Sequence, residues 1–194
     1  TCSARSIDVT AHAANTVASI VAVARTAPLR GWLKLDSGMH RLGLDPTAFA
    51  EANRVLSLHS GVAELIHMTH FSSAGDPASA ATDRQWARFA ACHAENPTAA
   101  ISAANSAALI SRPETRGDWV RPGIMLYGDN PLGGHPLALR PAMTLRARVI
   151  AVRDGSPAAR AGLRSGDYVR AINDKPTRDL SVWEGMRALR GAPG

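Results

Sequence analysis

The sequence predicts an α/β fold with a parallel sheet, followed by a small α+β segment. Strand-like apolar runs alternate with helical patterns about every 30 residues over the first two thirds of the chain, which is typical of βα units. Three of these runs end in polar residues, at 36–41, 69–70 and 105–106. An α/β barrel builds its site at the carboxyl ends of its strands. About four such units are present, so we expect a partial (β/α)8 barrel.

The first half of the chain is expected to hold two helices and two strands. Residues 10–26 are rich in Ala and Val and predict a helix, and residues 31–36 predict a short strand. Asp45 and Pro46 supply an N-cap and an N1 proline to a helix of about a dozen residues. Residues 62–71 predict the next strand.

The pattern continues to a break at residues 129–136, which are rich in Pro and Gly. Before the break we expect a helix over 78–95, a strand over 99–104, a helix over 106–110 and a strand over 119–127. The break divides the chain into domains 1–136 and 137–194. In the second domain, residues 143–152 alternate with period two, as a half-buried strand does. A short helix, a strand and a helix over 180–190 follow.

Composition is that of an ordinary globular protein, with 45% hydrophobic and 20% charged residues. No apolar run reaches the roughly 20 residues that span a bilayer, and no signal peptide is recognisable. The chain lacks an initiator Met, so we expect it to begin partway through a longer sequence. Cys2 and Cys92 lie in no metal or disulfide motif, which favours reduced thiols in a cytoplasmic protein without a metal site.

The net charge of +6 belongs to the second domain. Residues 1–136 carry 11 basic and 11 acidic side chains, whereas residues 137–194 carry 11 basic and 5 acidic ones. These arginines lie among apolar residues without an aromatic platform, so we interpret them as a solvated surface and expect no nucleic-acid partner.

Four motifs, in order, resemble the second half of the alanine racemase barrel, a pyridoxal-phosphate (PLP) fold. They are LKLDSGMHRLG at 33–43, MTHF at 68–71, AANSAA at 103–108 and VRPGIMLYG at 120–128. The resemblance covers roughly residues 1–153. It implies a PLP-dependent racemase that interconverts L- and D-alanine for cell-wall precursors, acting on a small amino acid.

The resemblance also implies roles for individual residues. The turn at Asn105-Ser106 and the backbone at Gly123 and Ile124 would hold the PLP phosphate, although Ser106 is equally the residue type that caps a helix. Arg121 would donate to the pyridine nitrogen. An arginine there keeps that nitrogen unprotonated and weakens the electron sink, which favours racemisation over side reactions.

Three further residues have implied roles at the same end of the barrel. His70 would stand near the pyridine-facing arginine and orient it, with a structural histidine at a strand end as the alternative. Lys34 corresponds to a lysine that the family often carbamylates, and Arg41 to an arginine that contacts this carbamate and the phenolic oxygen.

Neither base that moves the proton is expected in this chain. The family's Schiff-base lysine comes from the first barrel strand, which would precede Thr1, and its tyrosine comes from a further β domain of the partner subunit. The chain has two lysines, Lys34 and Lys175. We therefore expect no catalytic residue here, PLP held non-covalently at best, and inactivity unless a complementary half or a homo-oligomer completes the site.

The tail over about 149–194 resembles part of a PDZ domain of C-terminal processing proteases. Its GSPA, ARAGL and SGD motifs predict a helix start at Ser156-Pro157, a C-cap at Gly162 and a turn at 165–167. An alternative function is thus a peptide-binding module on a non-catalytic scaffold. A third alternative is a chimeric composite without a selected function. The exposed edges of a half barrel predict self-association.

Overall fold

The protein is described by a computed structural model that covers residues 7–133, 137–140, 142, 149 and 151–190. The described chain divides into two compact units, 1–123 and 124–194. Within the described residues, no helix is long and apolar enough to cross a membrane.

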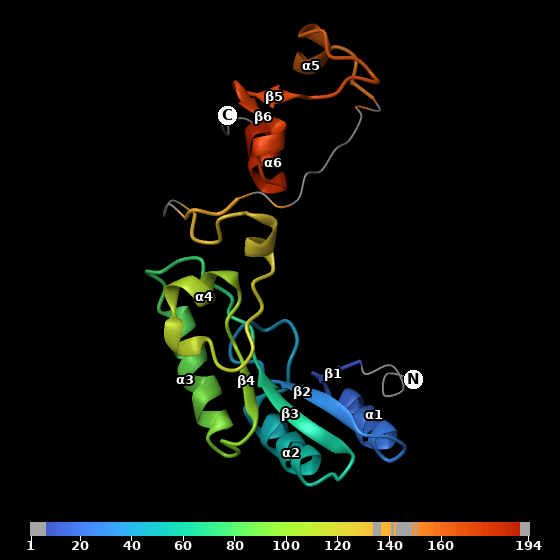
Figure 1. Cartoon of the computed structure of the whole chain (residues 1–194), viewed down its shortest axis with the longest axis vertical. Coiled ribbons are helices and arrows are strands. Elements are labelled where there is room, and N and C mark those ends of the chain that lie inside the picture. The colour runs from blue at the N-terminus through green and yellow to red at the C-terminus, as the bar shows by residue number, and fades with distance from the viewer. Residues whose placement is uncertain (1–6, 134–136, 141, 143–148, 150, 191–194) are drawn as a thin grey trace. The chain divides into compact units, whose positions relative to one another are not determined.

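The first unit is built on a four-stranded parallel sheet with strand order β1-β2-β3-β4. The strands are β1 (Val9–Ala11), β2 (Leu29–Lys34), β3 (Val62–Met68) and β4 (Ala100–Ser102). Because each neighbour in space is also the next strand along the chain, the sheet is a run of consecutive βα units, as predicted. Figure 1 shows these strands side by side with helices packed beside them.

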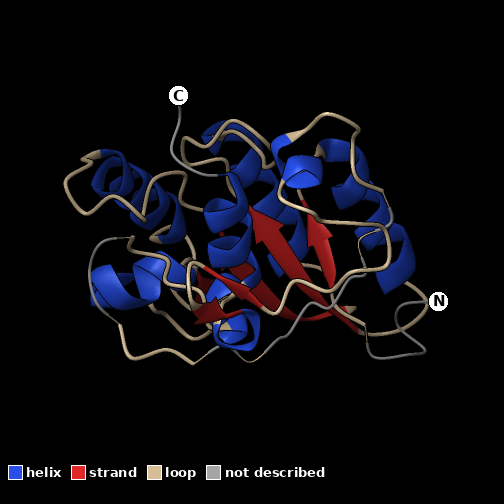
Figure 2. Cartoon of the chain, turned by 90° about the horizontal axis from the view of Figure 1, so that it is seen from above, coloured by secondary structure: helices blue, strands red, loops and turns tan. Residues whose placement is uncertain are grey.

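Helices connect the strands: α1 (Ala14–Ala24), α2 (Pro46–Ser57) and α3 (Ala81–His93), with the short α4 (Ser106–Ser111) after β4. Figure 2 shows the helices in blue and the strands in red. Helix α2 begins where Asp45 and Pro46 predict, since the Asp45 carboxylate accepts a hydrogen bond from the backbone N–H of Ala48 at 3.0 Å. Helices α3 and α4 also lie within or close to their predicted ranges.

Two predicted elements are wrong. The helix expected over 10–26 begins only at Ala14, because residues 9–11 form β1 and pair with β2. The strand expected over 119–127 does not form: Arg121 makes a single bridge to Asn105, and Ile124–Tyr127 is a 3-10 helix, η3. Pro122 has no N–H to continue a ladder, which explains why pairing stops there.

The two faces of the sheet differ in character. In β2, buried Leu29, Gly31 and Leu33 alternate with residues of the opposite face. The helix-covered face holds the fully buried side chains of Phe49, Phe89, Leu33, Leu56 and His67. The opposite face carries Arg30, which forms an ion pair with Glu64 at 2.6 Å.

The second unit contains η3 and the PDZ-like tail. Its helices are α5 (Pro157–Arg160) and α6 (Val182–Arg190), and β5 (Ala171–Ile172) pairs antiparallel with β6 (Lys175–Pro176). Ser156 caps α5 as predicted. The N–H groups of Gly162 and Leu163 bond to the carbonyls of Ala159 and Ala158, a Schellman ending.

Two further predictions concern the second unit. The strand predicted over 143–152 lies mostly outside the described residues. Helix α6 falls inside the range predicted over 180–190.

Candidate functional site at the carboxyl edge of the sheet

The loop that follows β2 is shaped by Asp36. One carboxylate oxygen of Asp36 accepts hydrogen bonds from the backbone N–H groups of Gly38, Met39 and His40, each at 3.0 Å. Burial acts to raise the pKa of this carboxyl, but these hydrogen bonds outweigh it, so the pKa is lowered. Gly43 closes the loop with φ of +135°, where an added Cβ would lie 2.5 Å from the Asp36 nitrogen. The LDSGMHRLG motif is therefore a compact turn that carries Arg41.

Arg121 lies against the ends of β3 and β4. Its guanidinium donates to the carbonyl oxygens of Thr69 at 2.5 Å, Ser102 at 2.9 Å and Ala103 at 3.3 Å, and also to the Ser102 hydroxyl. Burial lowers its pKa to about 10, so the group remains a cation at neutral pH. Neutral carbonyl partners orient this cation without neutralising it.

Lys34 is the last residue of β2 and is 9% exposed. Burial lowers the pKa of its amine, the charges of Arg41 and Arg121 lower it further, and Asp36 opposes them. Three cationic groups thus act on one another with a single carboxylate as counter-charge. The arrangement is unfavourable by itself and favours an anionic ligand.

His70 follows β3 at the same edge. Burial lowers its pKa to about 4, and the charges of Arg121, Lys34 and Arg41 contribute in the same direction. The imidazole is therefore neutral at pH 7. The structure brings His70, Lys34, Arg41 and Arg121 close enough to act on one another electrostatically.

The turn after β4 serves first as a helix cap. The Asn105 side chain accepts from the N–H of Ala108 at 3.0 Å and donates to the carbonyl of Phe71 at 3.3 Å. Asn105 is thus the N-cap of α4, and Ser106 is its first helical residue, buried at 5% exposure. The cap belongs to Asn105, so the alternative of Ser106 as the capping residue is wrong.

Gly123 and Ile124 follow Arg121 and Pro122 in the sequence. The Gly123 N–H donates to the carbonyl of Arg121 at 2.8 Å, and an added Cβ on Gly123 would meet nothing within 4 Å. The space beside Gly123 is therefore open. Ile124 is the first residue of η3 in the second unit.

A buried polar network behind the cluster was missed by the sequence reasoning. It comprises Ser37, Thr69 and Gln85, which are 2%, 0% and 3% exposed. Gln85 lies on α3, and its amide is the kind of polar group that is buried only with partners. The available signal was a glutamine at a position of an amphipathic helix that faces the core.

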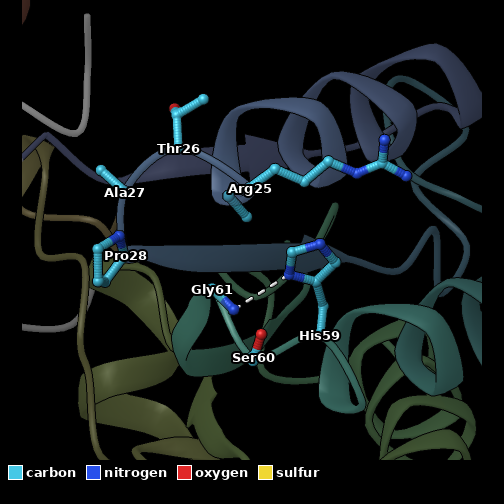
Figure 3. A pocket seen from close by; sticks show the side chains of 8 residues that line it. Arg25, Thr26, Ala27, Pro28, His59, Ser60 and Gly61 are labelled. Carbon is cyan, nitrogen blue, oxygen red and sulfur yellow. Dashed lines mark hydrogen bonds between the residues drawn. The ribbon is translucent and has the colours of Figure 1, made fainter.

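A hollow lies at the other end of the strands. A cavity of about 410 Å³ is lined by residues of the α1–β2 and α2–β3 connections, and the His59 ring accepts from the Gly61 N–H there at 3.1 Å (Figure 3). It contains none of the predicted site residues. Because α/β barrels carry their sites at the carboxyl edge, we place the functional site there. Among the described residues, no cluster of His, Cys, Asp or Glu could hold a metal ion.

The fold and this edge define the first unit as part of an α/β barrel with a cationic site. Residues 1–131 match the family model of the alanine racemase N-terminal domain, and residues 148–194 match that of a PDZ domain. The chain therefore belongs to the alanine racemase family.

Individual proteins similar to this chain are also alanine racemases. The catabolic alanine racemase of Pseudomonas aeruginosa is 44% identical over 146 residues, which are 74% of this chain and 41% of that protein. An alanine racemase of Shewanella sp. W3-18-1 is 39% identical over 194 residues, 98% of this chain and 53% of that protein. The chain thus spans about half the length of the relatives it matches.

Solved structures give the same fold. The biosynthetic alanine racemase of Pseudomonas aeruginosa superposes with a TM-score of 0.70 at 39% identity, covering 78% of this chain and 43% of that one. The alanine racemase of Bartonella henselae, solved with covalently bound pyridoxal phosphate, gives a TM-score of 0.67 at 24% identity and covers 79% and 45%.

Proposed function

We propose that residues 1–136 supply the pyridine end and part of the phosphate end of a PLP site in an amino-acid racemase with alanine as substrate. The observation that supports this most is the cationic cluster at the carboxyl edge of the sheet. Lys34, Arg41 and Arg121 act on one another there with Asp36 as the opposing charge. Membership of the alanine racemase family supports the same assignment.

The residues present fit this cofactor by the chemistry of their donors. PLP carries a phosphate, a phenolic oxygen and a pyridine nitrogen, all of which accept hydrogen bonds. Arg121 would hold the pyridine nitrogen and Arg41 the phenolic oxygen. Ser106, next to its capping neighbour Asn105, would hold the phosphate together with the backbone at Gly123 and Ile124. When bound, the cofactor supplies an electron sink for the carbanion formed when the substrate loses its α-proton.

Arg121 and His70 set the protonation at this end of the site. The carbonyls of Thr69, Ser102 and Ala103 hold the guanidinium in one orientation. A guanidinium donates its proton to a hydrogen bond but does not transfer it, because its pKa stays well above neutrality. His70 stays neutral beside it, so it orients its neighbours without adding a fourth charge.

We also propose that Lys34 is carbamylated. The neutral amine nitrogen would form a bond to the carbon of carbon dioxide and release a proton, giving an anion in place of a cation. The lowered pKa of Lys34 favours this step because a larger fraction of the amine is neutral at a given pH. The carbamate would then pair with Arg41 and relieve the repulsion in the cluster.

These 194 residues are not proposed to racemise unaided. Their two lysines are Lys34, which the carbamate engages, and Lys175, which lies in β6 of the second unit. Neither is assigned to carry the cofactor, and neither Tyr127 nor Tyr168 is assigned as the opposing base. Activity is proposed for an assembly in which a homo-oligomer or a complementary half supplies both bases.

A second candidate function is peptide binding by the tail, favoured by the PDZ family match to residues 148–194. Helix α6, the β5–β6 hairpin and the capped α5 belong to this segment. A Gly-rich loop that would capture a peptide carboxylate is not recognisable in the sequence directly before Val149, where residues 143–148 contain no glycine. Titration with hydrophobic C-terminal peptides is expected to give no saturable binding, and a micromolar dissociation constant would establish this second function.

PLP binding by the 194-residue chain tests the first proposal. One equivalent should bind with saturation, and Arg121→Met should weaken binding at least tenfold, because the pyridine nitrogen loses its donor. Arg54→Met is the matched control, since Arg54 is an exposed arginine on α2 paired with Glu51. Equal binding by Arg121→Met and the wild type would refute the assignment.

A further inference from the structure

We propose that Gln85, on α3, is a positioning residue that holds the β2 and β3 ends of the cofactor site in register through a neutral hydrogen-bond chain. This inference rests on the proposed function. Gln85 reaches the cluster through the backbone carbonyl of His70 and not through a charged side chain, so it acts on the backbone that carries Lys34, His70 and Arg121.

The Gln85 amide uses both of its donors and both of its acceptor positions. Its nitrogen donates to the Ser37 hydroxyl at 3.3 Å and to the His70 carbonyl at 3.1 Å. Its oxygen accepts from the backbone N–H of Ser72 at 3.0 Å and from the Ser72 hydroxyl at 3.1 Å. One side chain thus ties the loop after β2 to the loop after β3. A buried amide with every position filled has a single orientation.

The series of hydrogen bonds that starts at Gln85 has a defined donor-to-acceptor direction. The Thr69 hydroxyl donates to the Leu35 carbonyl at 3.1 Å, which uses its one proton. The Ser37 hydroxyl, 2.7 Å from it, must therefore be the donor to Thr69. Ser37 in turn accepts from Gln85. The protons all point from α3 toward Leu35, the residue next to Lys34.

The same series of hydrogen bonds extends to Arg121. The Thr69 carbonyl accepts from the Arg121 guanidinium at 2.5 Å, and the Thr69 N–H donates to the Ser102 carbonyl at 3.2 Å. Thr69 therefore joins β2, β4 and the arginine at one residue. Because the network members Gln85, Ser37 and Thr69 do not titrate, the register that they set does not change with pH.

A positioning role is needed because the cluster repels itself. Like charges on Lys34, Arg41 and Arg121 push the strand ends apart when no anion is bound. A neutral network opposes this without adding a counter-charge that would compete with an anionic ligand. Loss of Gln85 should therefore let Lys34 move away from Arg121 and toward solvent.

The test uses Gln85→Met in the full 194-residue chain, with Thr82→Val as the matched control. Thr82 lies on the same helix and is 2% exposed, and its hydroxyl is buried without a hydrogen-bond partner. Two readouts are taken: the PLP dissociation constant, and the pH dependence of Lys34 acetylation by competitive labelling and peptide mass spectrometry. Lys175, the chain's other lysine, serves as the internal reference.

Gln85→Met should weaken PLP binding about tenfold and move the half-labelling pH of Lys34 upward, toward that of an ordinary lysine. Thr82→Val should change neither readout. If circular dichroism shows that Gln85→Met does not fold, Ser37→Ala removes the next member of the hydrogen-bond series. It should change the PLP dissociation constant and the half-labelling pH of Lys34 in the same directions, by smaller amounts.

Unchanged Lys34 labelling in a folded Gln85→Met or Ser37→Ala variant overturns the inference. Wild type that does not bind PLP, together with shifted Lys34 labelling in the variants, would reject the proposed function and retain the positioning role.

Discussion

The Nδ1 atoms of His67 and His93 lie 3.1 Å apart, in a layer where β3 meets α2 and α3. The other ring nitrogen of His67 lies 2.9 Å from the Asn53 side-chain oxygen, which is an acceptor, so His67 carries its proton at Nε2. His93 must then donate from Nδ1. A proton added to His67 would meet the His93 N–H, and His67 is 0% exposed.

This geometry predicts acid sensitivity. Burial lowers the pKa of His67 to about 4, and His93 contributes, whereas an unfolded chain binds this proton near the ordinary value of 6.5. The unfolded state therefore binds more protons between these pH values. The free energy of unfolding has its full value above pH 6.5 and falls as the pH drops toward 4. For one fully buried group the loss is on the order of 3 kcal/mol.

His67→Leu should flatten this pH dependence in denaturant unfolding. Asn53 keeps other donors after the change, since Ser57 and Asn96 both bond to its oxygen at 3.1 Å. Leu56→Val is the control, because it shortens a fully buried side chain of α2 without removing a titratable group, so it should lower stability and keep the wild-type slope. An equal slope in His67→Leu and wild type would rule out His67 as the source. His70 adds a residual slope of the same sign.

A second prediction concerns Ser181, which caps α6 and contacts Asp129. Its hydroxyl donates to the Asp129 carboxylate at 3.0 Å and accepts from the Glu184 N–H at 3.2 Å. Asp129 lies within the racemase match, and Ser181 within the PDZ match. Ser181→Ala should cost about 1–2 kcal/mol, because it removes a cap and a donor to a buried carboxylate.

Amide hydrogen exchange measures this cost as faster exchange in α6. Ser156→Ala, which removes the cap of α5 instead, is the control and should leave α6 protection unchanged. If both variants exchange like the wild type in α6, the Asp129–Ser181 contact does not stabilise the tail.

A third prediction concerns self-association. The outer edge of β4 is covered, because the Ile101 N–H donates to Asp118 at 2.8 Å and its carbonyl accepts from the N–H groups of Asp118 and Trp119. Among the described residues, β1 has one strand partner, β2, so its outer edge remains for pairing. Association should therefore run through β1 rather than through both edges.

Thr10→Lys places a charge on this edge at an exposed residue and should weaken association about tenfold in sedimentation velocity. Ser19→Lys adds the same charge on exposed α1 and should have no effect. A monodisperse wild-type monomer would contradict the expectation outright.

The carbamate proposed for Lys34 gives a fourth prediction. Intact-mass measurement in bicarbonate buffer should show a labile carboxyl adduct on the wild type that acid removes. Lys34→Arg should abolish it, whereas Lys175→Arg should retain it. An adduct that persists in Lys34→Arg would show that the modified residue is not Lys34.

Local signals predicted the parts of the fold that depend on a few adjacent residues. Asp45-Pro46 and Ser156-Pro157 each start a helix because the cap and the N1 proline act within one turn. Residues 9–11 gave no such signal: a three-residue strand within an Ala-rich run is decided by its pairing with β2. The run at 119–127 has strand composition, but Pro122 and Gly123 interrupt its pairing.

The cationic cluster was predictable because each member lies in a family motif at a strand end. Gln85 was not, because its partners Ser37 and His70 are 48 and 15 residues away in sequence and meet only in the folded unit. The assignment of the cap to Asn105 rather than Ser106 likewise needed the backbone conformation at that turn.

Reduction of the PLP-saturated chain with borohydride, followed by intact-mass and peptide analysis, tests the central claim most directly. We predict saturable binding of one PLP without a stoichiometric lysine adduct, because Arg41 and Arg121 are proposed to hold the cofactor and neither Lys34 nor Lys175 is proposed to carry it. A stoichiometric adduct mapped to Lys34, or the absence of saturable binding, would contradict it.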